Sequence, residues 1–365
     1  MPHNSSVTKT QLKVFCLITF ALCAQALAAA APLNTAAKAG AASQEQKAVP
    51  LSACDRLIAQ SHILFEKKKY KEAFALADKA IEADPKSSKA YCNKGEIAAH
   101  IGDAETGHAM AVKALQCDDK NARAHVIMAQ YYYYIDDYKS GVKELNTALK
   151  LDPKVDKAYD FLIMVSTVQK DYKKAIEYAG LNIKQDPTSS HRYFKRAALY
   201  QMLKQDTQAL ADLNQAIALN PREKTFHLAR ADIFVTLGRE KEALEETAKI
   251  LTIEPNCGRA LYLRARLFSK AGDHVKAIAV YNQILQANPL DDETILFRGK
   301  EYLRMGKFKE ALADFNESIN NGPNDSRDAY EARAELYEKT GQNELANKDR
   351  ATAQKIRARP AVMPL

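Results

Sequence analysis

Residues 258–291, GRALYLRARLFSKAGDHVKAIAVYNQILQANPLD, carry the pattern that decides the fold of this 365-residue chain. In the first half, apolar residues such as Leu261 and Phe268 recur at helical spacing until Gly272-Asp273 interrupts the run. A second apolar series follows and ends at Asn288-Pro289. Proline has no amide hydrogen and disfavours helix in the residue before it, so it ends the second helix. The stretch therefore predicts two antiparallel helices joined by a tight turn.

The same pattern recurs along the chain with a step of 34 residues. The prolines on this lattice are Pro85, Pro153, Pro187, Pro221, Pro255, Pro289 and Pro323, and Asp119 occupies the vacant step. Counted from Cys54, position 20 of each unit is never larger than alanine: Ala73, Gly107, Gly141, Ala175, Ala209, Ala243, Ala277 and Ala311. Position 8 is small in all these units except at Ile163. A fixed period of this length is typical of stacked repeats, whose paired helices approach closely at small residues.

These positions together resemble the tetratricopeptide repeat family over residues 54 to about 357. The resemblance implies an all-α, right-handed α-α superhelical solenoid of about nine antiparallel helix hairpins. We assign residues 1–28 to a signal peptide, 29–53 to a flexible alanine-rich linker and 54–325 to eight units of 34 residues. A ninth, capping unit occupies residues 326–359, with its pattern restarting one residue late at 327, and residues 360–365 form a tail.

The N-terminal residues have the pattern of a secretory signal peptide. Lys9 and Lys13 precede an apolar run from Val14 to Ala24, and Ala26-Leu27-Ala28 supplies a cleavage site. We therefore expect an exported protein, periplasmic or secreted, with a bacterial source favoured. The alternative is an uncleaved anchor, because weak apolar character continues through Ala31, and only that case predicts membrane association. Cleavage lowers the net charge from +8 by the two lysines to +6, too little to favour nucleic acid.

Arginine recurs at position 7 of the later units. Positions 7 and 23 lie symmetrically about the turn and should face each other across the hairpin. An acid stands at position 23 opposite four of these arginines, and Val280 stands opposite Arg264. We interpret the series as structural ion pairs rather than a binding ladder. The pairs are Arg196 with Asp212, Arg230 with Glu246, Arg298 with Asp314, and Arg333 with Asp349.

A second stripe, at positions 2, 5, 9 and 12 or 13, lies on the opposite side of each first helix. The resemblance implies that this stripe lines the concave groove of the solenoid. Basic residues at position 2 oppose the helix macrodipole, so their recurrence needs a reason. We predict that the groove binds a partner protein or an extended, acidic peptide, and the alternative is a solvated surface without a partner. The candidate residues are Arg123, Tyr133, Tyr134, Lys157, Phe161, Lys195, Arg259, Tyr262, Arg266, Lys300 and Arg304.

Two local features allow alternatives. Cys92 and Cys117 belong to opposite ends of one hairpin and could form a disulfide, with Cys54 as another partner for Cys92. In repeat four, Ile163, Ser166 and Asn182 replace the usual small, aromatic and alanine residues. That departure indicates either ordinary drift or a local change of superhelical pitch over residues 156–189.

The motifs do not favour catalysis. The sequence has no HExxH motif and no glycine-rich phosphate loop, and its histidines are scattered. We therefore predict a protein without enzymatic activity, cofactor, metal site or small-molecule substrate. Two alternatives to a groove-binding scaffold are kept. One is a structural subunit of a cell-envelope or secretion assembly that binds through its convex surface or ends, and the other is an enzyme or an enzyme's accessory subunit.

Overall fold

The computed structural model describes residues 51–155, 157–322 and 326–356. The predicted signal peptide, the linker up to residue 50 and the predicted tail lie outside the described residues. The first described helix begins at Ala53, and the Ser52 side chain caps it by accepting a hydrogen bond from the Asp55 amide. The last residues assigned to the linker therefore belong to the start of the first repeat.

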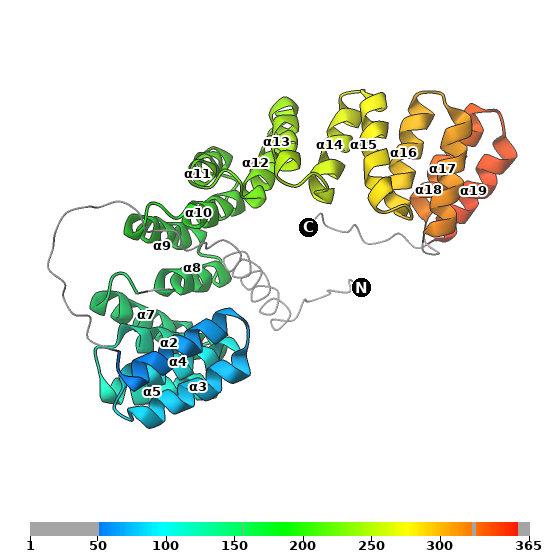
Figure 1. The fold of residues 1–365 in the computed structure, drawn as a ribbon. Helices are drawn as coiled ribbons and strands as arrows, with labels where there is room; N and C mark the ends of the chain where they lie inside the picture. Colours follow the sequence, from blue (N-terminus) through cyan, green and yellow to red (C-terminus); the bar gives the residue numbers. More distant parts are fainter. Residues whose placement is uncertain (1–50, 156, 323–325, 357–365) are drawn as a thin grey trace, which may run out of the picture. The chain divides into compact units, whose positions relative to one another are not determined.

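The described residues contain eighteen α-helices and no strand, which confirms the all-α prediction (Figure 1). Their bounds are α2 Ala53–Glu66, α3 Tyr70–Ala83, α4 Ser88–His100, α5 Ala104–Cys117, α6 Ala122–Tyr134, α7 Tyr138–Leu151, α8 Ala158–Val168, α9 Tyr172–Gln185, α10 Ser190–Met202, α11 Asp206–Leu219, α12 Lys224–Thr236, α13 Glu240–Ile253, α14 Gly258–Lys270, α15 His274–Ala287, α16 Asp292–Arg304, α17 Phe308–Asn321, α18 Arg327–Lys339 and α19 Asn343–Lys355. Taken in pairs from α2 and α3, they form repeats one to nine.

The chain divides into two compact units, unit 1 up to Val165 and unit 2 from Ser166 onward. In unit 1, each of α2, α4 and α6 packs on the helix that follows it, and α3 and α5 pack on the next repeat. In unit 2 the same alternation runs from α9 to α19. Each unit is thus a stack of helix hairpins. Within the stack, the second helix of one hairpin packs on its own first helix and on the first helix of the next hairpin.

Repeat four departs from the 34-residue lattice in the structure as well. Its first helix, α8, begins at Ala158, two residues later than the lattice position. Lys157 immediately before it has a left-handed backbone, with φ of 69°. Ile163, Ser166 and Asn182 are all buried, so the unusual side chains are accommodated inside the repeat. The change of pitch over residues 156–189 stays a prediction.

Positions 8 and 20 are where the two helices of a repeat come closest. In repeat one the Ser61 hydroxyl donates to the Ala73 carbonyl oxygen at 2.8 Å. In repeat two a Cβ on Gly95 would lie 3.3 Å from the Gly107 carbonyl oxygen, so backbone packs directly on backbone. A larger side chain at either position would force the helices apart, which explains the small residues there.

The apolar core is shared between successive repeats. Phe226 of α12 is fully buried in one cluster with Ala197 of α10, Leu213 of α11 and Ile233 of its own helix. A similar cluster around Phe315 of α17 includes residues of α16 and α18. No single hairpin could bury these side chains alone, so each repeat depends on its neighbour for stability.

The predicted disulfide between Cys92 and Cys117 is wrong, because both cysteines are free thiols, as is Cys54. The Cys92 side chain is fully buried in the contact between repeats two and three, against residues such as Ala111 and Ile127. Cys117 is exposed at the end of α5. Burial raises the pKa of the Cys92 thiol to about 12, so it behaves as a small apolar core residue.

The turn within each repeat requires one residue with a left-handed backbone. After α10, Leu203 ends the helix and Lys204 has φ of 55°. The amide of Lys204 donates to the Gln201 carbonyl and that of Gln205 to the Tyr200 carbonyl, which is a Schellman motif. The equivalent residues in the nine repeats are Lys68, Gly102, Asp136, Lys170, Lys204, Gly238, Gly272, Gly306 and Gly341, all with positive φ.

We expect the Lys204→Gly substitution to stabilise the protein. A left-handed residue other than glycine costs about 1–2 kcal/mol, and glycine costs about 0.5–1 kcal/mol of backbone entropy, so the net gain is about 0.5–1 kcal/mol. Urea denaturation followed by far-UV circular dichroism measures the shift in midpoint. The control is Lys204→Ala, which removes the same exposed side chain and keeps the strain. Equal stabilisation by both variants would contradict this explanation.

Candidate partner-binding surface

The arginines at position 7 form the ion pairs that the sequence predicts. Arg196 Nε and Nη2 each donate to the Asp212 carboxylate at 2.7 Å. Arg298 holds Asp314 in the same bidentate way, at 2.9 and 2.7 Å, and Arg333 does so with Asp349. Each pair joins the two helices of one repeat and is partly buried, so these arginines belong to the scaffold.

Three of the arginines at position 7, Arg230, Arg298 and Arg333, also reach an asparagine of the preceding repeat, which the sequence did not lead us to predict. Arg230 donates to the Asn214 amide oxygen at 2.7 Å and Arg298 to that of Asn282 at 2.8 Å. Both asparagines precede their arginine by 16 residues, the same separation as the acid that follows it. That repeated spacing is a signal that could have revealed the link. Arg264, opposite Val280, instead lies over the Phe268 ring, 5.4 Å from its centre.

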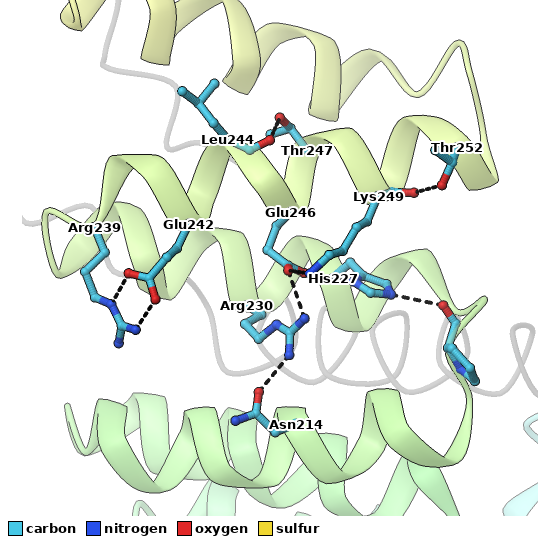
Figure 2. Close-up of polar contacts among 11 residues, drawn as sticks. Asn214, His227, Arg230, Arg239, Glu242, Leu244, Glu246, Thr247, Lys249 and Thr252 are labelled. Carbon is cyan, nitrogen blue, oxygen red and sulfur yellow. Dashed lines mark hydrogen bonds and ion pairs between the residues drawn. The ribbon is translucent and has the colours of Figure 1, made fainter.

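Repeat six has the most elaborate version of this arrangement, shown in Figure 2. The Glu246 side chain is only 3% exposed. It contacts His227 Nδ1, Arg230 Nη2 and Lys249 Nζ, each at 2.8 Å. The other ring nitrogen of His227 lies 3.0 Å from the Pro221 carbonyl oxygen, which ties the helix pair to the preceding turn.

The Glu246 carboxylate stays ionised in this buried position because of its partners. Burial alone would raise its pKa. The hydrogen bonds from His227, Lys249 and Arg230, with the charge of Arg230, outweigh burial and lower the pKa of Glu246 to about 2. The network therefore depends on a charged carboxylate, and its role is to hold α12 and α13 together.

In unit 1 some of the predicted groove residues make contacts within the fold, and others are exposed to solvent. Arg123 Nε donates to Glu96 of the preceding repeat at 2.9 Å. Tyr133 is 7% exposed and its ring packs on Tyr138, 5.7 Å between centroids, so little of it is accessible to a partner. Tyr134 is 57% exposed. Lys157 is exposed before α8, and Phe161 is half-buried on α8.

In unit 2 two of the predicted cations are also used within the scaffold. Arg259 Nη2 lies 2.6 Å from Asp232 of the preceding repeat. Arg304 pairs with the buried Glu301 and donates to Ser269 at 3.0 Å. Arg259 and Arg123 both reach an acid 27 residues earlier, which supplies a reason for a basic residue at a helix start. Lys195 is half-buried on α10.

The remaining candidates of unit 2, Tyr262 and Arg266 of α14 and Lys300 of α16, form one cluster with Phe297 of α16. We call these four residues the basic aromatic patch. The Tyr262 and Phe297 rings meet edge to face, with centroids 5.7 Å apart. Arg266 lies over the Tyr262 ring at 6.0 Å and Lys300 over the Phe297 ring at 5.4 Å. Among the described residues, neither cation has a carboxylate within ion-pair distance. The patch therefore presents two unneutralised charges beside two partly exposed rings.

One acid borders this patch. The Tyr262 hydroxyl donates to Glu293 of α16 at 3.3 Å. Burial raises the pKa of Tyr262 above its usual range, and the negative charge of Glu293 raises it further. Tyr262 is thus a neutral hydrogen-bond donor, and its ring stays available for apolar contact.

The described residues hold no group of three or more histidine, cysteine, aspartate or glutamate side chains placed to bind a metal ion. Within the same residues, every helix is too short or too polar to cross a bilayer.

We expect the Glu246→Gln substitution to lower the free energy of unfolding by about 3 kcal/mol at neutral pH, because Arg230 and His227 lose their buried carboxylate. The pKa of Glu246 is lowered from 4.5 to about 2 on folding, so its charge contributes fully above about pH 4.5 and the contribution disappears as the pH falls toward 2. Urea denaturation at several pH values should show the two proteins converging over that range.

The control for this experiment is Glu245→Gln, which changes the exposed neighbour and should leave stability nearly unchanged. A stability difference for Glu246→Gln that persists unchanged down to pH 2 would contradict the role of its charge.

Comparison with known proteins agrees with this architecture. Sequence models described as tetratricopeptide repeat match residues 56–87, 76–109, 122–155, 207–254 and 247–292. No curated protein matches the sequence closely enough to count as a relative.

Several solved structures have a similar fold. The C-terminal part of a tetratricopeptide repeat-containing protein from Cytophaga hutchinsonii is 15% identical with a TM-score of 0.54, over 65% of this chain and 98% of that one. PilF from Pseudomonas aeruginosa is 18% identical with a TM-score of 0.48, over 59% and 97% of the two chains. A tetratricopeptide repeat protein from Parabacteroides merdae is 21% identical with a TM-score of 0.45, over 65% and 93%.

The repeat models match five stretches of the helix hairpins that follow a 34-residue step, and the Cytophaga hutchinsonii structure shares the fold. The matched stretches of this chain are tetratricopeptide repeats.

Proposed function

We propose that this protein is a scaffold whose unit 2 binds an extended, acidic segment of a partner protein at the basic aromatic patch. Tetratricopeptide repeats in general indicate a protein–protein interaction scaffold. The observation that carries the proposal is that Arg266 and Lys300, both on the predicted binding stripe, have no carboxylate partner among the described residues, whereas Arg123, Arg259 and Arg304 do.

The chemistry of the patch suits a peptide with both acidic and apolar side chains. A partner carboxylate gains a charge-assisted hydrogen bond from Arg266 or Lys300 without displacing an internal acid. The Tyr262 and Phe297 rings each have a cation over them, and the Phe297 ring also stacks on the buried Tyr281 ring. The parts of the two rings that stay exposed provide apolar surface for an aliphatic or aromatic side chain. These contacts come from two neighbouring repeats, so an extended segment crossing α14 and α16 would engage all of them.

The other cations of the stripe are weaker candidates for the same physical reason. Arg123, Arg259 and Arg304 already have carboxylate partners in the fold, Glu96, Asp232 and Glu301. A ligand carboxylate at those sites would have to compete with an acid held in place by the scaffold. The exchange of one ion pair for another gains little free energy, so the patch should dominate the affinity.

The test is the double substitution Arg266→Glu with Lys300→Glu in the full chain. With a fluorescein-labelled peptide of sequence GSEALEGS as probe, fluorescence anisotropy at low salt should show at least a roughly tenfold loss of affinity, because two attractive contacts become repulsive. The affinity should also fall as salt is added, since exposed charges are screened.

The matched control is Lys241→Glu with Lys309→Glu, which makes the same change of charge on exposed residues of the second helices α13 and α17. It should leave the affinity unchanged. If the control weakens peptide binding as much as the patch variant does, binding depends on overall charge and the proposed site is wrong. If binding responds to the control alone, the convex-surface alternative is favoured instead.

A further inference from the structure

We infer that Glu293 makes the basic aromatic patch selective for the placement of acidic residues within a bound peptide. The patch binds a peptide with two acidic residues three positions apart, and acidic residues between these two lower the affinity. This inference rests on the proposed function of the patch, and it assigns the selectivity to one residue that the sequence analysis did not choose.

The charges around the ring pair are segregated along the helices. On α14, Arg266 follows Tyr262 by one helical turn. On α16, Glu293 precedes Phe297 by one turn and Lys300 follows it by nearly one turn. The contact between the two rings and the hydrogen bond from Tyr262 to Glu293 place the two helices at the same level. Both cations therefore lie on one side of the rings, and the acid lies on the other.

Glu293 presents an uncompensated charge to whatever covers the rings. It is exposed, and among the described residues no cation lies within ion-pair distance of its carboxylate. The nearby charges of the same stripe are neutralised inside the fold: Arg259 by Asp232, Lys270 by Glu240 and Arg304 by Glu301. The charges that act on a ligand at this surface are therefore those of Arg266, Lys300 and Glu293.

The two cations come from neighbouring repeats, so together they can engage two acids of one extended ligand. The Tyr262 ring of α14 and the Phe297 ring of α16 bring these repeats together, with centroids 5.7 Å apart. In a polyproline II conformation, which extended peptides adopt readily, residues three positions apart share one side of the chain and are separated by about 9 Å. A peptide in this conformation that crosses α14 and α16 can direct one such acid to Arg266 and the other to Lys300. The two intervening side chains point in two different directions, so one of them lies toward the rings and Glu293, where a carboxylate would be repelled.

The experiment compares three labelled peptides on the full-length chain: GSEALEGS, GSEEEEGS and the uncharged GSQALQGS. Simple attraction to a basic surface would favour the most acidic peptide. We expect the opposite, with GSEALEGS binding about three- to fivefold more tightly than GSEEEEGS, the size expected for one exposed charge interaction. Glu293→Gln should strengthen binding of GSEEEEGS and remove the preference.

The control is Glu105→Gln, which removes an exposed acid from the first turn of α5 in unit 1 and should leave the preference intact. If GSEEEEGS binds the wild type as tightly as GSEALEGS or more tightly, the selectivity is overturned and the acidic-peptide function stands. If neither acidic peptide binds better than GSQALQGS, the proposed function itself fails. An equal loss of preference in the Glu105 variant would assign the effect to net charge and overturn the role of Glu293.

Discussion

Packing between successive hairpins is the constraint on which the rest of this structure depends. A two-helix hairpin has one apolar side and no core of its own, so it becomes stable only against the next hairpin. Phe226 illustrates this, because it is fully buried by residues of the preceding repeat. Within each hairpin, the small residues at positions 8 and 20 let the two helices approach closely, as at Ser61 and Ala73. The 34-residue period is thus a requirement of packing.

Ion pairs make the polar contacts between the two helices of a repeat. Asp212, Asp314 and Asp349 are buried carboxylates, and each is satisfied by a bidentate arginine that belongs to the facing helix. Removing one partner of such a pair would leave an uncompensated buried charge. Where the arginine also reaches an asparagine of the preceding repeat, as from Arg298 to Asn282, the pair fixes the register between repeats as well as within one.

This has a consequence for function. Many charged side chains that the sequence assigns to partner binding form ion pairs inside the scaffold instead. Arg123 and Arg259 stand at the start of their helices on the predicted groove stripe, yet each is held by an acid of the preceding repeat. Tyr133 and Tyr134 are adjacent in a run of four tyrosines, yet one is buried and the other exposed. The candidate surface that remains is small, and it is defined by which side chains the fold leaves without a partner.

The sequence by itself determined the repeat, its period, the all-α hairpin and the arginine–acid pairs, because these depend on residues at constant separations along the chain. It also placed Tyr262, Arg266 and Lys300 on one stripe. The asparagines that join repeats were not predicted, although Asn214 and Asn282 too lie at a constant separation from their arginines. The left-handed residue of the turn could not be predicted where lysine or aspartate stands in place of glycine. The prediction of a Cys92–Cys117 disulfide was wrong. Hairpin topology shows which helix ends lie near each other, but it does not show that one thiol is buried between repeats and the other is exposed. Only the tertiary structure decided that Arg259 is neutralised and Arg266 is not, because neutralisation depends on which side chains meet in space, and the sequence only places both residues on the same stripe.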